Sequence, residues 1–385
     1  MISPIARLPF ELASKILTLT IPTPPTWAAL TKLMSVCRAW SDIALATPSL
    51  WTTIRDEGVR PAKFPLALKI WLSRGRDLPV SVSTPHLAWD LEKDLIEALE
   101  KDVHRVESLE GVWSSKFSGS KPFRALKSLT VVHNPRRYTD SLDFSIEHIL
   151  GLLDRSPQLA ELTWLMHRYS GTRALPAATQ PCCHTTLRHL RLECVNQSSI
   201  FGSRDILKYL TLPSLLTLST GTSCPIYSLR PFLERSSPPL QILKLCPEHA
   251  LDANKGEFSF LALVPTLTDL ELTTDALTGA EPPSLLEFLN TKLDVLPKLQ
   301  NLALKEGFPH EKEGYQLVAE FLTKRQTSLK SLRLEFRHSY YSMHFRNVPP
   351  ALYALAHDGI HIHIKCDSCS TEGVLNLQPG SLPPA

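Results

Sequence analysis

One phrase, leucine-x-x-leucine-x-leucine, recurs along most of the chain and limits the folds that the chain can adopt. Clear copies are "PQLAELTWL", "TTLRHLRLE", "PTLTDLELT" and "TSLKSLRLE". The copies begin, 20 to 33 residues apart, at Val106, Leu126, Leu159, Leu187, Leu215, Leu240, Leu267, Leu299 and Leu329. Self-similarity at such a period is typical of stacked strand-and-helix units, none of which can bury its apolar side alone.

The segments between these copies have apolar residues at spacings of three and four, which predicts helices. These segments are 86–103, 144–156, 203–212, 226–236, 282–296 and 314–325, and residues 65–83 read as a helix followed by a strand. The fold class predicted for the chain is α/β, with a small helical unit at the N-terminus followed by an irregular leucine-rich-repeat-like solenoid. The alternative is a globular α/β domain with parallel strands.

The expected organisation has four parts, which differ in their apolar spacing and proline content. They are a helical unit at 1–54, connecting helices with a first repeat-like unit at 55–103, the solenoid at 104–366 and a flexible tail at 367–385.

Alternation along each strand sends the leucines inward and the residues between them to the other, concave face of the sheet. Glu161 and Thr163 take such positions in one strand, and their counterparts elsewhere are mixed in charge. Such a surface favours a folded protein partner over a polyanion. The candidate substrate-facing residues are His189, Arg191, Glu193, Lys244, Asp269, Glu271, Lys305, Arg333 and Glu335.

Composition excludes several other classes. The formal net charge is +3, from 41 basic and 38 acidic residues, so nothing predicts a nucleic-acid surface. No run approaches the roughly 18 apolar residues of a membrane helix. The eight cysteines are scattered, and the first residues lack the apolar core of a signal peptide, which predicts a cytoplasmic or nuclear protein.

Two clusters contain residue types that bind metal. In "GIHIHIKCDSC", His361 and His363 precede a Cys-x-x-Cys, but both histidines alternate with isoleucines. That alternation predicts a terminal strand rather than a zinc site. Cys182 and Cys183 lie beside His184 in a loop-like segment, and adjacent cysteines chelate one tetrahedral ion poorly.

Motifs of catalysis and cofactor binding are also missing from the sequence. It contains no G-x-S-x-G, phosphate-binding loop, H-E-x-x-H or G-x-G-x-x-G pattern. We therefore expect no catalytic residue, no metal and no cofactor, and a protein that is not an enzyme.

The first fifty residues predict three short helices in a very small core. Leu8, Leu12, Ile16 and Leu19 form one apolar stripe, and the prolines at 22–25 end that helix. Further helices are expected at about 26–37 and 38–45. The unit has more large apolar side chains than it can hide, which indicates docking on a neighbour. Trp51 is expected to pack against the following domain, and Cys37 is interpreted as a packing residue.

This N-terminal segment resembles an F-box. The resemblance rests on "LPFELASKIL" at 8–17, "VCRAWSDIA" at 36–44 and "TPSLW" at 47–51, and it covers about residues 3–54. The proline-rich "IPTPPT" between the first two helices departs from the pattern where the family varies. The resemblance implies docking on the Skp adaptor of a cullin-RING ubiquitin ligase. By position, the adaptor-binding residues would be Leu8, Pro9, Leu12, Ile16, Leu17, Val36, Cys37 and Trp40.

The function expected from this resemblance is that of a substrate-recognition adaptor, which holds a substrate protein near the ligase. Its partners would be the Skp-type adaptor, through it a cullin, and an unknown substrate protein, with no nucleic acid or membrane. The alternatives are a non-catalytic interaction scaffold without ubiquitin transfer and an enzyme with a concealed metal site.

Overall fold

The structure is a computed structural model, and it describes part of the chain. The described residues are 8–21, 25–57, 59, 63–84, 92–112, 121–132, 146–166, 181–194, 206–224, 226–247, 257–273, 283–306, 312–336, 350–366 and 374–378. The chain divides into two compact units, Met1–Leu187 (unit 1) and Arg188–Ala385 (unit 2).

Unit 1 begins with a helical segment. Its helices are α1 (Phe10–Thr20), α2 (Trp27–Met34), α3 (Arg38–Ala46) and the 3₁₀ helix η2 (Pro48–Trp51). Thr26 caps α2, because its hydroxyl accepts a hydrogen bond from the Ala29 N–H at 3.2 Å. Thr47 ends α3 with an extended backbone, as a residue before proline usually does. The three expected helices are therefore confirmed, with boundaries shifted by a few residues.

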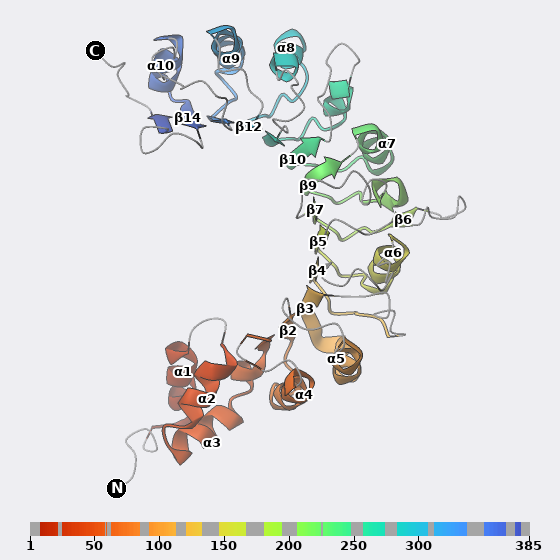
Figure 1. The fold of residues 1–385 in the computed structure, drawn as a ribbon, viewed down its shortest axis with the longest axis vertical. Helices are drawn as coiled ribbons and strands as arrows, with labels where there is room; N and C mark the ends of the chain where they lie inside the picture. The colour runs from red at the N-terminus through yellow and green to blue at the C-terminus, as the bar shows by residue number, and fades with distance from the viewer. Residues whose placement is uncertain are drawn as a thin grey trace. The chain divides into compact units, whose positions relative to one another are not determined.

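A parallel sheet follows directly in unit 1. Its strands are β1 (Thr53–Arg55), β2 (Val80–Thr84), β3 (Val106–Val112), β4 (Ser128–Val132) and β5 (Glu161–Met166), in that order. Between them lie α4 (Phe64–Arg74), α5 (Glu92–Leu99), the 3₁₀ helix η5 (Val103–Arg105) and α6 (Ile146–Arg155), and the short β6 (Cys182–Cys183) comes last. Figure 1 shows α4, α5 and α6 on one side of these strands.

Unit 2 has the same plan. Its sheet contains β7 (His189–Cys194), β9 (Thr217–Cys224), β10 (Ile242–Pro247), β11 (Asp269–Thr273), β12 (Asn301–Glu306), β13 (Ser331–Phe336), β14 (His361–Cys366) and β15 (Val374–Leu377). The remaining elements are η7 (Ile206–Tyr209), β8 (Leu210–Thr211), α7 (Ile226–Ser236), η9 (Glu257–Leu263), α8 (Pro283–Thr291), α9 (Lys312–Arg325) and α10 (Pro350–His357). In Figure 1 the labelled helices α7 to α10 lie along one side of the sheet.

The register of the strands aligns the leucines of successive units. Leu243, Leu270, Leu302, Leu332 and Ile362 lie side by side on five neighbouring strands and are all buried. Apolar side chains stacked in this way bury one continuous core against the helices. The coarse prediction of a mixed α/β fold with a helical N-terminus and a large, mostly parallel sheet is confirmed.

Several elements differ from the sequence-based expectation. Residues 203–212 were expected to be a helix, but the described part has only the 3₁₀ turn η7 and the short strand β8. Helix α10 had no expected counterpart. Strand β14 confirms the expected terminal strand, but β15 lies within the segment expected to be a flexible tail, where it pairs antiparallel with β14.

Two arginines, of which Arg325 is buried and Arg235 is exposed, join successive strand-and-helix repeats. Arg325, in the last turn of α9, donates to the carbonyls of Leu296 at 2.9 Å and Val295 at 2.7 Å, after α8. Arg235, in the last turn of α7, donates to the carbonyls of Leu207 and Leu210. Backbone carbonyls that leave a helix or turn need such partners when they are buried. Each of these two guanidinium groups therefore links its own strand-and-helix repeat to the preceding repeat.

Candidate protein-interaction surfaces

Helix α1 exposes an apolar stripe, which consists of Leu8 just before the helix, Leu12 and Ile16. All three side chains are at least 40% exposed, and Leu12 reaches 53%. An adjoining side of the same helix faces the core, since Ala13 and Leu17 are completely buried. A small domain that buries one side of a helix and exposes large aliphatic residues on the other presents a docking surface.

The structure revises the expectation for Leu17. Its side chain is wholly buried, so in this structure it packs in the core of the helical segment and does not face a partner. Leu17 follows Ile16 directly, and neighbouring residues of a helix point about 100° apart, which separates the two side chains. Pro9 is exposed at the N-cap of α1, where its carbonyl accepts a hydrogen bond from the Ala13 N–H at 3.0 Å.

The other predicted adaptor-binding residues lie around the start of α3. Val36 is exposed, whereas Cys37 and Trp40 are half-buried. Cys37 occupies the N-cap of α3 in an extended conformation and makes no capping side-chain hydrogen bond. Val36 is thus accessible to a partner, whereas Cys37 and Trp40 are partly packed within the helical segment. Their roles toward a partner remain predictions.

Sequence reasoning missed two exposed apolar residues in the same region. Phe10 on α1 and Leu45 on α3 are exposed in the structure, as is Leu19, which the sequence had placed in line with Leu8, Leu12 and Ile16. The apolarity of Phe10 and Leu45 was visible in the sequence, but both fall outside the spacing of three and four. They extend the apolar surface of the helical segment beyond the stripe.

A cluster of tryptophans joins the helical segment to the first strands of unit 1. The Trp51 ring packs edge-on against the Trp71 ring of α4 with 5.5 Å between centroids, and Trp27 packs on Trp71 at 5.6 Å. The Trp51 indole N–H donates to the Ala44 carbonyl at 2.9 Å, and the Arg74 guanidinium lies 4.4 Å from the Trp51 ring centroid. Trp51 thus packs against the following elements, as predicted.

This joint contains no flexible linker. Only Thr52 separates η2 from β1, and the Thr52 carbonyl accepts a hydrogen bond from the Ser81 N–H at 2.8 Å. A Cβ atom at Gly75 would lie 3.1 Å from the Trp51 carbonyl oxygen, so the backbones approach closely here. The helical segment and the first strands of unit 1 therefore share one core.

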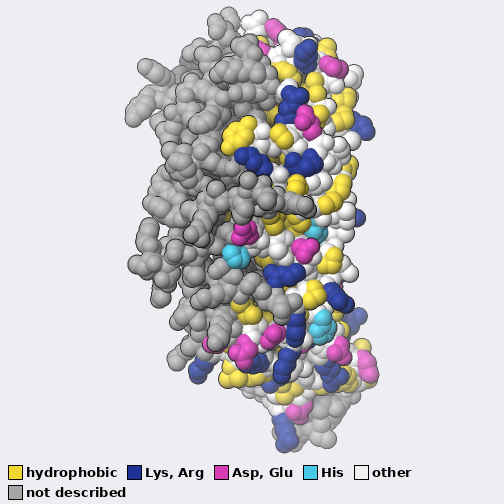
Figure 2. All heavy atoms as spheres, turned by 90° about the vertical axis from the view of Figure 1, so that its right-hand side faces the viewer, with side chains coloured by type: hydrophobic (Ala, Val, Ile, Leu, Met, Phe, Trp, Pro, Cys, Tyr) yellow, Lys and Arg dark blue, Asp and Glu magenta, His cyan; other side chains and the backbone are white. Residues whose placement is uncertain are grey.

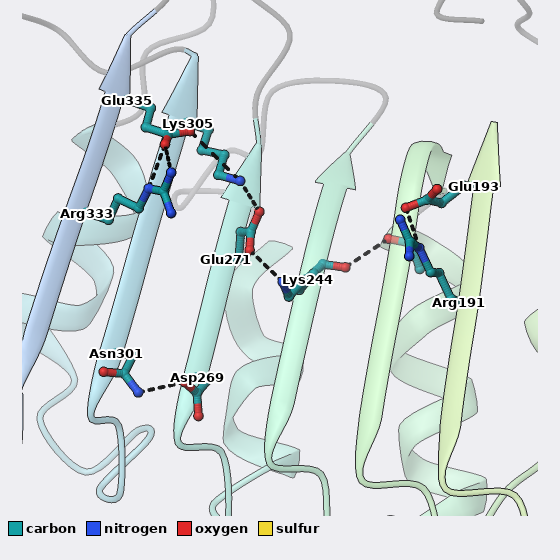
Figure 3. Close-up of polar contacts among 10 residues, drawn as sticks. Arg191, Glu193, Lys244, Asp269, Glu271, Asn301, Lys305, Arg333 and Glu335 are labelled. Atoms are coloured by element: carbon teal, nitrogen blue, oxygen red, sulfur yellow. Dashed lines mark hydrogen bonds and ion pairs between the residues drawn. The ribbon is translucent and has the colours of Figure 1, made fainter. Parts of the chain in front are cut away.

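On the sheet of unit 2, the residues between the leucines form a charged ladder, which consists of Lys244, Glu271, Lys305, Glu335 and Arg333. Glu271 contacts Lys244 at 3.1 Å and also pairs with Lys305. Lys305 reaches Glu335 at 3.9 Å, and the Arg333 Nε–H donates to Glu335 at 2.6 Å. Figure 3 shows these side chains linked across four neighbouring strands, β10 to β13.

The middle carboxylate of the ladder is electrostatically stabilised. Burial alone would raise the pKa of the Glu271 carboxyl, but the hydrogen bonds from Lys305 and Lys244 outweigh it and lower that pKa below its ordinary value. Glu271 is therefore ionised throughout the neutral range and holds both lysines in place.

The remaining candidate residues lie on the same polar face. Arg191 and Glu193 form a pair at 2.6 Å within β7, and the Asn301 side chain donates to Asp269 at 2.6 Å. His189 is exposed at the start of β7. All nine substrate-facing candidates thus project from strands of unit 2, each directly next to a buried leucine.

Glu161 and Thr163 take the equivalent positions on β5 of unit 1. The polar face of unit 1 otherwise contains mainly hydroxyl side chains, such as Ser81, Ser128 and Thr130. Charge is therefore denser on the sheet of unit 2.

Charge is also mixed elsewhere on the surface. On the face drawn in Figure 2, basic and acidic side chains are interspersed among the coloured residues, without a region of one sign. This distribution agrees with the small net charge of +3.

Neither metal candidate from the sequence forms a cluster in the described part of the chain. Among these residues, no group of three or more histidine, cysteine, aspartate or glutamate side chains could hold a metal ion. His184 is buried and its Nε2 lies 3.0 Å from the Ser156 carbonyl, while burial raises the pKa of the Cys182 thiol. Cys369 lies outside the described residues.

Comparison with known proteins supports the N-terminal assignment. Residues 5–57 match the family model described as F-box-like, which covers the helical segment and β1. This segment is therefore an F-box-like domain, a class typical of non-catalytic adaptors that bind Skp-type proteins, and it indicates an adaptor role of the SCF type.

The other comparisons add little. No curated protein matches the chain. A solved protein from Bacteroides fragilis is similar, with 16% identity, 70% of this chain and 71% of that chain covered, and a TM-score of 0.36. No helix among the described residues combines the length and apolarity needed to cross a membrane.

Proposed function

We propose that this chain is a substrate-recognition subunit of a Skp–cullin–F-box ubiquitin ligase. The observation that carries the proposal is the apolar stripe of Leu8, Leu12 and Ile16, exposed on the first helix of the F-box-like domain. The Skp-type adaptor would cover this stripe, together with Val36 at the start of α3.

In this proposal the strand-and-helix units of residues 104–366 form a leucine-rich-repeat-like solenoid, and their polar face binds the substrate protein. The regular register of buried leucines and the parallel strand order support that interpretation. The chain would act in the cytoplasm or the nucleus.

In this proposal the mechanism is proximity, and the chain itself supplies no nucleophile. Tethering a substrate near a ubiquitin-charged enzyme raises the effective concentration of the substrate's lysines around the thioester. The joint of Trp27, Trp51 and Trp71 would contribute by fixing the direction of the first strands relative to the adaptor.

The test uses one leucine from the stripe and one matched leucine outside it. Leu12→Asp puts a charge on the exposed stripe, and Leu66→Asp does the same on α4, where Leu66 is 64% exposed. We expect Leu12→Asp to weaken binding of the Skp-type adaptor at least about 30-fold, the loss typical of an interface hot spot. Leu66→Asp should bind as the unchanged chain does, in pull-down and calorimetry.

Equal binding by both variants would contradict the assignment of this surface. Adaptor binding that depends on Leu12 but never recruits a cullin would instead favour the scaffold without ubiquitin transfer.

A further inference from the structure

The two end cations of the charged ladder are more exposed than its acids, while the middle cation, Lys305, is 26% exposed. The side chains of Lys244 and Arg333, at its two ends, are 49% and 53% exposed, whereas Glu271 and Glu335 are 22% and 14% exposed. The pair on β7 shows the same order, since Arg191 is more exposed than Glu193. A partner that approaches this face meets ammonium and guanidinium groups before it meets any carboxylate.

We propose that the charged ladder binds an extended, acidic segment of a partner protein, with one carboxylate on Lys244 and a second on Arg333. This inference rests on the proposed function, because it names the class of substrate that the polar face would select.

Charge complementarity argues for this occupant. The ladder contains three cations and two carboxylates, and its two end cations each have one carboxylate within 4 Å among the described residues. An Arg333 guanidinium with one acid partner still has N–H groups that can donate to a second carboxylate. Lys244 and Arg333, at the two ends of the ladder, can therefore each bind a further carboxylate.

Strand geometry sets the spacing of the two partner carboxylates. Lys244 lies on β10 and Arg333 on β13, three strand spacings away, which corresponds to about 14 Å. An extended peptide that crosses the strands advances about 3.3 Å per residue, so about four residues span this distance. The segment should carry acidic residues at positions i and i+4.

The middle of the ladder leaves room for such a segment. Ala303 lies between Glu271 and Arg333 in the register of the sheet, and its methyl group is the smallest side chain in that row of β10 to β13. The small side chain also allows Lys305 to reach diagonally to Glu271. At Ala303 itself, a bound segment would therefore meet only a methyl group, next to the Lys305 side chain.

The internal acids compete with the partner for the same cations. Removal of Glu335 releases Arg333, and removal of Glu271 releases Lys244. Neutralising either acid should therefore strengthen the binding of an acidic segment, whereas a merely solvated surface would bind no segment in either form.

The experiment measures fluorescence anisotropy of labelled nine-residue peptides with the full chain at low salt. The probe has glutamates at residues 3 and 7 in a Gly/Ser background, and a control peptide has them at residues 3 and 4. The variants are Lys244→Gln with Arg333→Gln, and Glu335→Gln. The matched control is Arg230→Gln, because Arg230 is 59% exposed and pairs with Glu234 at 2.9 Å on α7.

We expect the double variant to weaken binding of the i, i+4 peptide about tenfold, and Glu335→Gln to strengthen it about threefold, on the scale of exposed ion pairs. Arg230→Gln should leave it unchanged, and the adjacent-glutamate peptide should bind more weakly. Glu271→Gln provides a second variant of the same sign should Glu335→Gln not fold.

Three results would overturn the proposal. They are no binding of any peptide, an equal loss with Arg230→Gln, and binding only of a third peptide, which is titrated alongside and has phosphoserine in place of both glutamates. Adaptor binding through Leu12 is measured separately, so failure of the ladder proposal and failure of the ligase proposal are distinguishable.

Discussion

The apolar stripe of α1 and the charged ladder of unit 2 are both exposed, but they are built in opposite ways. The stripe consists of aliphatic side chains that contribute to binding only when a partner removes them from water. The ladder consists of charges that are already paired with one another, so a partner must replace contacts as well as add them. The stripe is suited to tight, constant association, and the ladder to selection among partners.

The strongest test of this comparison lies within α1 itself. Leu17 is wholly buried and Leu12 is exposed, although both are leucines on one helix. We expect Leu17→Ala to lower the free energy of unfolding by about 2–5 kcal/mol, because it leaves a cavity. Leu12→Ala should change it by less than about 0.5 kcal/mol.

Thermal unfolding followed by tryptophan fluorescence measures both variants, since Trp27, Trp51 and Trp71 lie in the adjoining joint. A larger loss for Leu12→Ala than for Leu17→Ala would reverse the assignment of the two faces of α1.

Salt should separate the two surfaces by a smaller effect. Raising NaCl from about 50 to 300 mM shortens the screening length, which weakens exposed charge–charge contacts and leaves apolar burial nearly unchanged. We expect adaptor binding to change less than about twofold over this range, and acidic-peptide binding to fall several-fold, as titrations at each salt concentration would measure. Equal salt dependence for both would show that the surfaces do not differ as described.

The smallest expected effect concerns the pH dependence of the ladder. The lowered pKa of Glu271 means that its contribution to stability is complete above its unfolded value, near 4.5, and is lost as the pH falls through the lower folded value. The stability difference between the unchanged chain and Glu271→Gln should therefore be constant from pH 7 to 5 and shrink below about pH 4. Denaturant unfolding at each pH measures it, with a difference below about 1 kcal/mol.

A difference that increases toward acid pH would mean that Glu271 is destabilising in its ionised form. That result would contradict the network of Lys244, Glu271 and Lys305 drawn in Figure 3.

Much of the fold could be predicted because the relevant signals are local. The spacing of Leu267, Leu270 and Leu272 predicts a strand with one buried face, and β11 has that pattern. The start of α1 and its end before the prolines also follow from neighbouring residues. Strand β15 was not predicted, because it is short and is stabilised by pairing with β14.

The candidate surfaces were predicted in part. The stripe of Leu8, Leu12 and Ile16 was found from its spacing, whereas Leu17 was assigned to the adaptor-binding set only by its position in the F-box resemblance, and the structure buries it. The position of a residue in a family pattern does not reveal which side of the helix faces the core in this chain. Packing against the neighbouring helices settles it, and Ala13 and Leu17 occupy the buried side.

The sequence by itself determined which residues would alternate with the leucines, because side chains of a strand point to opposite faces in turn. It therefore placed Lys244, Glu271, Lys305, Arg333 and Glu335 on one face. Only the tertiary structure decided that these five form one ladder, with its two end cations more exposed than its acids. Contacts between residues about 30 positions apart depend on strand register, and that register is set by the packing of buried leucines through the whole unit.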